Sequence, residues 1–174
     1  IQKVYYHKMG TPQSQDQLFY QNPANPLRFY GVGVNKEETM MFLTESGMDQ
    51  GINLFVRDLR QPNSQFIQMT GDCSKTYSHV EIIGDDIDML TNAGAQKYRL
   101  MVANLKKPGY QEWKELIPEQ DAVMEEVTFV DGDKMVLTNT KDNCRQVYLY
   151  NIKGEKLTEI KLPGVGSARF SGKR

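Results

Sequence analysis

The chain has 174 residues, of which 39% are hydrophobic and 25% are charged, and its formal net charge is −1; this is the composition of a globular domain large enough to bury a core. A charge so close to zero, with no basic run longer than Lys106–Lys107, argues against a nucleic-acid partner and against a polybasic membrane-binding patch. The apolar stretches all fall short of the roughly 20 residues that a membrane-spanning helix needs.

The N-terminal segment, residues 1–26, holds two strand-like runs, KVYYHKMG and DQLFYQN. The chain begins with IQKVYYH, which has neither an initiator Met nor the pattern of a signal peptide. It stops abruptly at FSGKR. We interpret the sequence as a piece of a longer protein.

Strand patterns dominate the rest of the chain, whereas helical periodicity is scarce. Three runs are rich in β-branched, aromatic and aliphatic residues, as strands are: NLFVRDL (Asn53–Leu59), YRLMVANL (Tyr98–Leu105) and RQVYLYNI (Arg145–Ile152). Each run carries Asp or Asn just before its last apolar residue, at positions 46 and then 47 residues apart: Asp58, Asn104 and Asn151.

Clusters of turn-forming residues recur at the same interval along the sequence. One set lies between strand-like runs at NKEE (Asn35–Glu38), GDD (Gly84–Asp86) and DGD (Asp131–Asp133). A second set is SGMDQG (Ser46–Gly51), NAGAQ (Asn92–Gln96) and TKDN (Thr140–Asn143), and a third, RQPNSQ, KKPGY and IKGEK, follows the three runs. Three kinds of loop in each period of about 47 residues predict a four-stranded up-and-down unit, which is the signature of a β-propeller blade.

We therefore predict an all-β fold, an arc cut from a β-propeller, as a single partial domain over residues 1–174. Its parts are the end of a preceding blade (1–26), three complete four-stranded antiparallel blades (27–70, 71–119 and 120–163) and the start of the next blade (164–174). A ring needs four to eight blades, so such an arc leaves apolar blade faces uncovered. We expect the fragment to self-associate through those faces.

The sequence offers little that could carry chemistry. No serine lies in a Gly-x-Ser-x-Gly elbow, and the two histidines, His7 and His79, have no second His or Cys at the spacing of metal ligands. Cys73 and Cys144 are interpreted as free thiols. The acidic clusters GDDID and DGDK lack the ligand alternation of a calcium loop, and we interpret them as hairpin turns. We expect no catalytic residue, metal or cofactor in this chain.

Several segments resemble the prolyl oligopeptidase (prolyl endopeptidase) family in collinear order. They are VYYHKMGTPQSQDQLFYQNP (Val4–Pro23), TNAGAQKYRL (Thr91–Leu100), WKELIPE (Trp113–Glu119) and LPGVGSARFSGKR at the end of the chain. The family has Pro after the second alanine of TNAGAQKYRL, where this chain has Gln96. The resemblance covers nearly the whole chain, which makes it more specific than any single motif.

The resemblance implies a non-catalytic propeller segment of a proline-specific serine endopeptidase. In that family a seven-bladed propeller restricts access to an α/β-hydrolase domain of the same chain, which carries a Ser-Asp-His triad and cleaves short proline-containing peptides. The triad lies outside the part that this chain resembles, so we expect the fragment alone to be inactive. The resemblance implies that two substrate-lining positions of the family correspond to Phe29 and Met48 in this chain. An Arg found nearby in animal members of the family corresponds to Glu45.

The alternative is a propeller module that acts as a protein–protein interaction platform and has no peptidase activity. The presence of a hydrolase domain with a serine elbow elsewhere in the gene product would distinguish the two. Sparse cysteines favour the cytoplasm over a bacterial periplasm, where a leader would precede the fragment.

Overall fold

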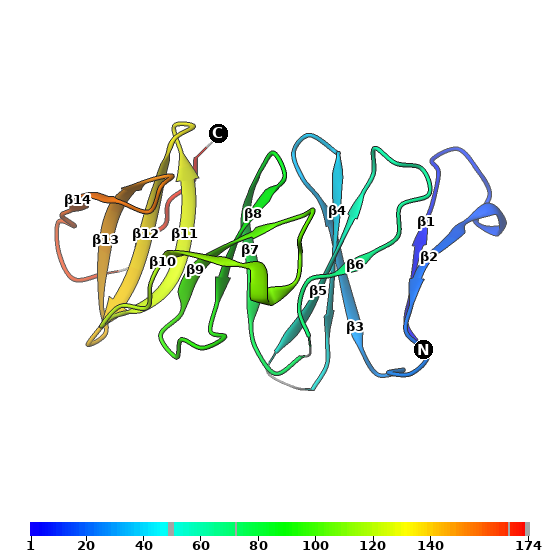
Figure 1. Cartoon of the computed structure of the whole chain (residues 1–174), viewed down its shortest axis with the longest axis horizontal. Helices are drawn as coiled ribbons and strands as arrows, with labels where there is room; N and C mark the ends of the chain where they lie inside the picture. Colours follow the sequence, from blue (N-terminus) through cyan, green and yellow to red (C-terminus); the bar gives the residue numbers. More distant parts are fainter. Residues whose placement is uncertain (49–50, 72, 167, 173–174) are drawn as a thin grey trace. The chain divides into compact units, whose positions relative to one another are not determined.

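The computed structural model is all-β and describes residues 1–48, 51–71, 73–166 and 168–172, without the side chains of His79 and Val80. Its strands form four antiparallel sheets, one of two strands and three of four (Figure 1). This confirms the predicted all-β architecture. None of the helices in these residues has the length and apolarity that crossing a membrane requires.

The chain divides into two compact units, Ile1–Ser74 and Lys75–Arg174. In the first unit, β1 (Lys3–Tyr6) and β2 (Gln17–Gln21) form the two-stranded sheet, and a 3-10 turn, η1 (Gln13–Gln15), lies between them. The strands β3 (Phe29–Val34), β4 (Met40–Ser46), β5 (Ile52–Asp58) and β6 (Ile67–Gln68) follow as a meander in which each strand pairs with the next.

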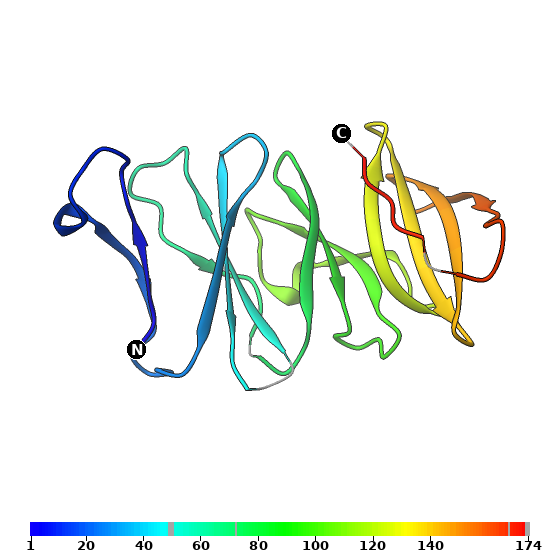
Figure 2. The same cartoon turned by 180° about the vertical axis from the view of Figure 1, so that it is seen from behind.

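The second unit holds two further meanders, visible from both sides in Figures 1 and 2. The first consists of β7 (Tyr77–Ile83), β8 (Asp86–Thr91), β9 (Arg99–Asn104) and β10 (Lys114–Ile117), with η2 (Tyr110–Glu112) before the last strand. The second consists of β11 (Val123–Val130), β12 (Lys134–Lys141), β13 (Cys144–Asn151) and β14 (Lys156–Ile160).

The repeated Asp or Asn ends the third strand of each four-stranded sheet and starts the turn that follows. Asp58 Oδ1 accepts a hydrogen bond from the backbone N–H of Arg60 at 2.9 Å. Asn104 Oδ1 does the same for Lys106 at 3.0 Å, and Asn151 Oδ1 for Lys153 at 3.0 Å. The Asp or Asn that recurs in the sequence therefore marks a turn that recurs in the structure. Short polar side chains stabilise such a turn by hydrogen bonding to the backbone two residues further on.

All three predicted sets of turns include residues with a positive φ angle. In the first hairpins of the three sheets these are Glu38, Gly84 and Asp131, in the second set Gly94, Asp142 and Asn143, and in IKGEK Gly154. Gly, Asn and Asp tolerate this region better than other residues. Part of the predicted SGMDQG turn, residues 49 and 50, lies outside the described residues.

In the first unit an aromatic cluster packs the two-stranded sheet against the meander. The ring of Tyr20 on β2 lies 5.3 Å from Tyr30, 5.5 Å from Phe55 and 5.6 Å from Phe66, measured between centroids. The pairs with Tyr30 and Phe66 are edge-to-face, an arrangement that stabilises beyond the area it buries. Aromatic side chains therefore provide the apolar contact between these two sheets.

In the second unit an aliphatic core lies between the two meanders. Buried side chains of β8, β9 and β10 meet those of β11, β12 and β13 in one cluster, whose members are Leu90, Leu100, Ile117, Met124, Val127, Phe129, Met135, Leu137 and Tyr150. The backbone N–H of Met124 also donates to the carbonyl of Lys97 at 2.9 Å. Each sheet thus buries one face against its neighbour, as blades in a propeller do.

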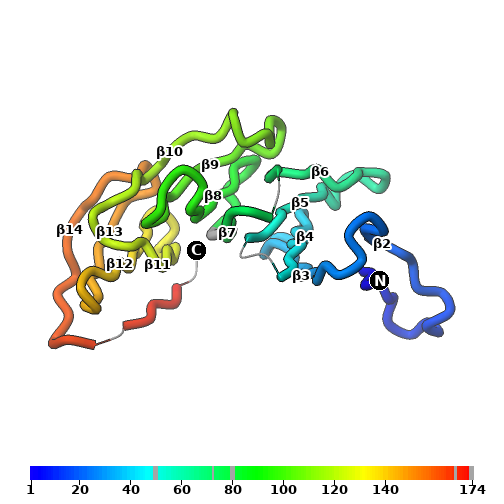
Figure 3. The backbone as a smooth tube through the Cα atoms, turned by 90° about the horizontal axis from the view of Figure 1, so that it is seen from below, coloured from blue at the N-terminus to red at the C-terminus, as the bar shows by residue number. Residues whose placement is uncertain are grey.

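After β14 the chain turns back toward the sheet it has just left (Figure 3). Arg145 of β13 donates to the carbonyl of Ala168 at 3.2 Å, and a Cβ on Gly172 would lie 2.7 Å from the carbonyl oxygen of Phe129 on β11. Residues 164–166 and 168–172 contain no strand. The prediction that 164–174 start another blade, like the other domain boundaries, stays a prediction.

Candidate functional site

The pairing of β3 with β4 brings the two predicted substrate-lining residues to the same end of one sheet. Phe29, the first residue of β3, is the cross-strand partner of Ser46, the last residue of β4, and Met48 follows two residues later. Phe29 is 57% exposed and Met48 is 97% exposed. Large apolar side chains with this much exposure are available to contact a ligand or another protein domain.

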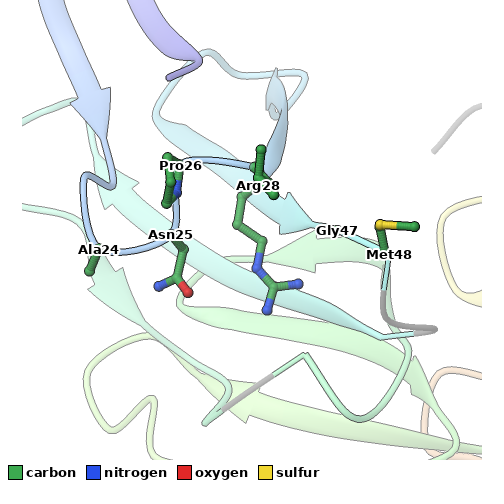
Figure 4. Close-up of a pocket in the computed structure, with 7 residues that line it drawn as sticks. Ala24, Asn25, Pro26, Arg28, Gly47 and Met48 are labelled. Carbon is green, nitrogen blue, oxygen red and sulfur yellow. The ribbon is translucent and has the colours of Figure 1, made fainter.

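A surface pocket of about 300 Å³ lies at this end of the sheet (Figure 4). Met48 lines it together with Gly47 and the connection from β2 to β3, residues 24–28. Phe29 comes next in the chain but is not among the lining residues. The structure therefore places Met48 in the pocket wall, whereas Phe29 is only adjacent in sequence to the lining residue Arg28.

Two consecutive turns shape the connection that forms the pocket. The N–H of Asn25 donates to the carbonyl of Asn22 at 3.2 Å, and the N–H of Arg28 donates to the carbonyl of Asn25 at 3.2 Å. Pro23 and Pro26 restrict the backbone between these bonds, because the proline ring fixes φ. The sequence analysis missed this connection, although the NPANP stretch carries the signal of a turn.

Arg28 closes the connection by crossing the end of β4. A Cβ on Gly47 would lie 2.4 Å from Nη1 of Arg28, so the guanidinium lies where any larger residue would have a side chain. The pocket thus combines apolar groups of Met48 and Leu27 with the guanidinium of Arg28 and the amide of Asn25. Such a mixture suits a peptide, which offers side chains to apolar walls and carbonyls to donors.

A carboxylate lies beneath this connection. Glu45 of β4 is only 3% exposed, and its Oε1 accepts a hydrogen bond from Asn22 Nδ2 at 2.7 Å. Burial, and then the negative charge of Glu45, raises the pKa of Tyr20 to about 12. The same two causes raise the pKa of Tyr30.

The described residues show no activated serine. Nδ1 of His7 lies 2.6 Å from Oδ1 of Asp16 at the exposed end of the β1–β2 sheet, but none of the hydrogen bonds found in the described residues joins a serine hydroxyl or a thiol to His7. The side chain of His79 lies outside the described part. Cys73 is buried with its Sγ 3.5 Å from the carbonyl of Glu45, Cys144 is exposed, and neither forms a disulfide.

No group of three or more His, Cys, Asp or Glu side chains that could hold a metal ion is present among the described residues. The acidic turns instead bind basic side chains of their own sheets. Lys134 Nζ lies 2.9 Å from carboxylate oxygens of both Asp131 and Asp133. The carboxylates of this turn are therefore partly neutralised by a lysine of the same sheet.

The TNAGAQKYRL segment is a shaped connection between β8 and β9. Thr91 Oγ1 donates to the carbonyl of Thr76 at 2.7 Å, and Asn92 Oδ1 accepts from the N–H of Thr76 at 2.8 Å. Arg99 Nη2 donates to the carbonyl of Ala93 at 2.8 Å and to the hydroxyl of Tyr110 at 2.9 Å. Hydrogen bonds within the segment and to Thr76 and Tyr110 therefore explain the specificity of this sequence.

The comparisons with known proteins agree on one family. The profile described as "Prolyl oligopeptidase, N-terminal beta-propeller domain" matches residues 1–174. A prolyl endopeptidase of Elizabethkingia meningoseptica is 30% identical over 173 residues, which cover 99% of this chain and 24% of that protein. The chain therefore spans about a quarter of the length of this relative.

Solved structures of prolyl oligopeptidase B from Galerina marginata share the fold. The apo protein superposes with a TM-score of 0.86 at 24% identity, over 97% of this chain and 25% of that one. A second structure, described as bound to a 35mer hydrolysis and macrocyclization substrate, gives a TM-score of 0.84 at 23% identity, over 95% of this chain and 24% of that one.

Proposed function

Because the chain belongs to the prolyl oligopeptidase family, as part of its N-terminal β-propeller domain, we propose that it is the non-catalytic propeller segment of a proline-specific serine endopeptidase. In this proposal the segment limits the access of peptides to a separate α/β-hydrolase domain. The pocket between the β2–β3 connection and Met48 contacts the part of the peptide that extends beyond the reacting bond.

The observation that carries the proposal is the placement of Phe29 and Met48. These two exposed apolar side chains lie at one end of the β3–β4 pair, and Met48 lines a pocket that also offers polar donors. Exposed apolar side chains are unfavourable on a surface that stays in contact with water. They are favourable where a peptide or a facing domain covers them. A relative of the same fold, described as bound to a 35mer substrate, supports a peptide as the ligand.

The first test concerns the activity of the full-length gene product that contains this chain. We expect it to hydrolyse a chromogenic Gly-Pro substrate and to lose that activity to a serine-directed inhibitor, while the 174-residue chain shows no turnover. A full-length product without turnover would reject the peptidase function and favour an interaction platform. Inhibitor-sensitive turnover by the 174-residue chain would reject the non-catalytic role.

The second test concerns the pocket. Met48→Ala in the full-length protein should raise KM for a long proline-containing peptide by about threefold to tenfold, because it removes part of an apolar contact, and should leave kcat unchanged. Met9→Ala is the matched control, since Met9 is 91% exposed but lies in the β1–β2 connection away from the pocket residues. An equal KM for wild type and Met48→Ala would reject the lining role.

A further inference from the structure

Glu45 is a buried acid for which the fold itself gives no obvious reason. It is 3% exposed in a strand whose other buried side chains, Met40, Phe42 and Leu43, are apolar. Burying a carboxylate costs free energy unless hydrogen bonds compensate for the lost water. Among the described residues, its side chain accepts a hydrogen bond from Asn22, at the start of the β2–β3 connection.

The other two four-stranded sheets show a related bond with neutral groups. Near the end of the second strand, Thr91 of β8 donates to Thr76, and Asn139 of β12 donates through Nδ2 to Oε1 of Gln120 at 2.8 Å. Both side chains are buried, at 0% and 1% exposure. In each sheet, then, a buried polar side chain of the second strand holds the segment that leads into that sheet.

The segment held by Glu45 differs from the other two because it forms the candidate pocket. Asn22 donates through its side chain to Glu45 and accepts the N–H of Asn25 with its carbonyl. One end of the connection is thereby fixed to β4 through Asn22, and at its other end the guanidinium of Arg28 lies close to Gly47, directly after β4. Glu45 and Gly47, the residues contacted, both lie within three residues of Met48.

We propose that Glu45 is a positioning residue for this pocket. Through Asn22 it holds residues 22–28 in the two-turn conformation that faces Met48, and it thereby determines how well the pocket binds an extended peptide. The inference rests on the proposed function, since it concerns the same pocket.

The test compares three variants of the full-length protein by steady-state kinetics. Asn22→Ala and Glu45→Ala remove the donor and the acceptor, whereas Glu45→Gln keeps an acceptor oxygen at the same position. For a long proline-containing peptide we expect KM to rise about threefold to tenfold in the two alanine variants, the range that corresponds to the loss of one such hydrogen bond. Glu45→Gln should stay within about twofold of wild type, and kcat should not change.

Two controls separate positioning from a general loss of structure. A short chromogenic substrate that cannot reach the pocket should keep its KM in every variant. Gln120→Ala, which breaks the related bond in the last sheet, should leave KM for the long peptide unchanged. If Glu45→Ala does not fold, Asn22→Ala tests the same hydrogen bond. Asn22 is only partly buried, so its replacement should disturb folding less.

The outcomes also distinguish this inference from the proposed function. Unchanged KM in Asn22→Ala and Glu45→Ala, together with a raised KM in Met48→Ala, overturns the positioning role and leaves the pocket as a peptide site. Glu45→Gln as defective as Glu45→Ala overturns it as well, because the hydrogen bond is then not the cause. Unchanged KM in Met48→Ala rejects the pocket itself and the inference with it.

Discussion

The guanidinium carbon of Arg57 on β5 lies 4.5 Å from the centre of the Phe19 ring on β2. The same group lies 5.9 Å from the ring of Phe66, just before β6. The Arg57 cation of the meander therefore contacts the two-stranded sheet through Phe19. A cation over an aromatic face at these distances stabilises by about 0.5–2 kcal/mol, depending on desolvation. This contact supplements the aromatic cluster around Tyr20.

Arg57→Met should therefore lower the free energy of unfolding of the chain by about 1–2 kcal/mol, because methionine keeps much of the apolar stem and loses the cation. Urea unfolding followed by circular dichroism measures the change. Arg57→Lys is the matched control and should lose less, since the charge remains. Equal stability of wild type and Arg57→Met would show that the ring contact contributes nothing.

Gly154 is required by both its backbone and its surroundings. Its φ is +81°, and a Cβ there would lie 2.3 Å from the backbone oxygen of Leu116 on β10. Gly154→Ala should cost about 2–4 kcal/mol of stability, from left-handed backbone strain plus the clash with a backbone atom. Gly132→Ala is the control: φ is +71° with no atom within 4 Å, so it should cost only about 1 kcal/mol. Similar losses in both variants would contradict the close approach to β10.

Tyr20 makes the stability of the chain sensitive to alkaline pH. Burial, the charge of Glu45 and Tyr30 together raise its pKa from 10.0 to about 12. The folded state therefore holds this proton more tightly than the unfolded state, so the contribution to stability is complete below pH 10.0 and is lost as pH rises toward about 12. Tyr20→Phe should unfold with less dependence on pH in that window. A pH dependence identical to that of wild type would contradict the assignment.

The pKa of Tyr20 can also be followed directly by the ultraviolet absorbance of the phenolate. Glu45→Gln should lower this pKa without restoring its ordinary value, because burial, the largest cause, remains. A pKa that does not respond to Glu45→Gln would show that the charge of Glu45 does not reach Tyr20.

Asp121 joins the two meanders of the second unit at the surface. Its carboxylate binds Lys141 of β12 and lies 3.4 Å from Lys97 Nζ in the β8–β9 connection, and these lysines, Lys141 first, hold its pKa below 3.8. A depressed carboxyl pKa stabilises the folded state above the ordinary value, and the effect is lost as pH falls through the folded value. Asp121→Asn should lower the melting temperature slightly at neutral pH, and the difference should vanish in acid and in high salt. A difference that persists in acid would refute the ion pairs.

Local patterns predicted the strands and turns because their causes lie within a few residues of each other. The backbone two residues further on is bound by each of the repeated side chains, Asp58, Asn104 and Asn151. The repeat can therefore be recognised from the sequence alone. The alternation of apolar residues likewise predicted which segments would form strands, and the length of the repeat predicted four strands in each repeat. Phe29 and Met48 were taken from the family resemblance, and their roles stay a prediction.

The sequence by itself determined an all-β repeat of four-stranded units and the family to which it belongs, because hydrophobic periodicity, turn residues and collinear motifs are all local properties of the chain. Only the tertiary structure decided where the pocket lies and what holds it. The bond from Asn22 to Glu45 joins residues 23 positions apart, and Gly47 matters because Arg28 crosses it. No periodicity encodes such contacts, since they arise when the pairing of β3 with β4 brings distant polar groups to one end of a sheet.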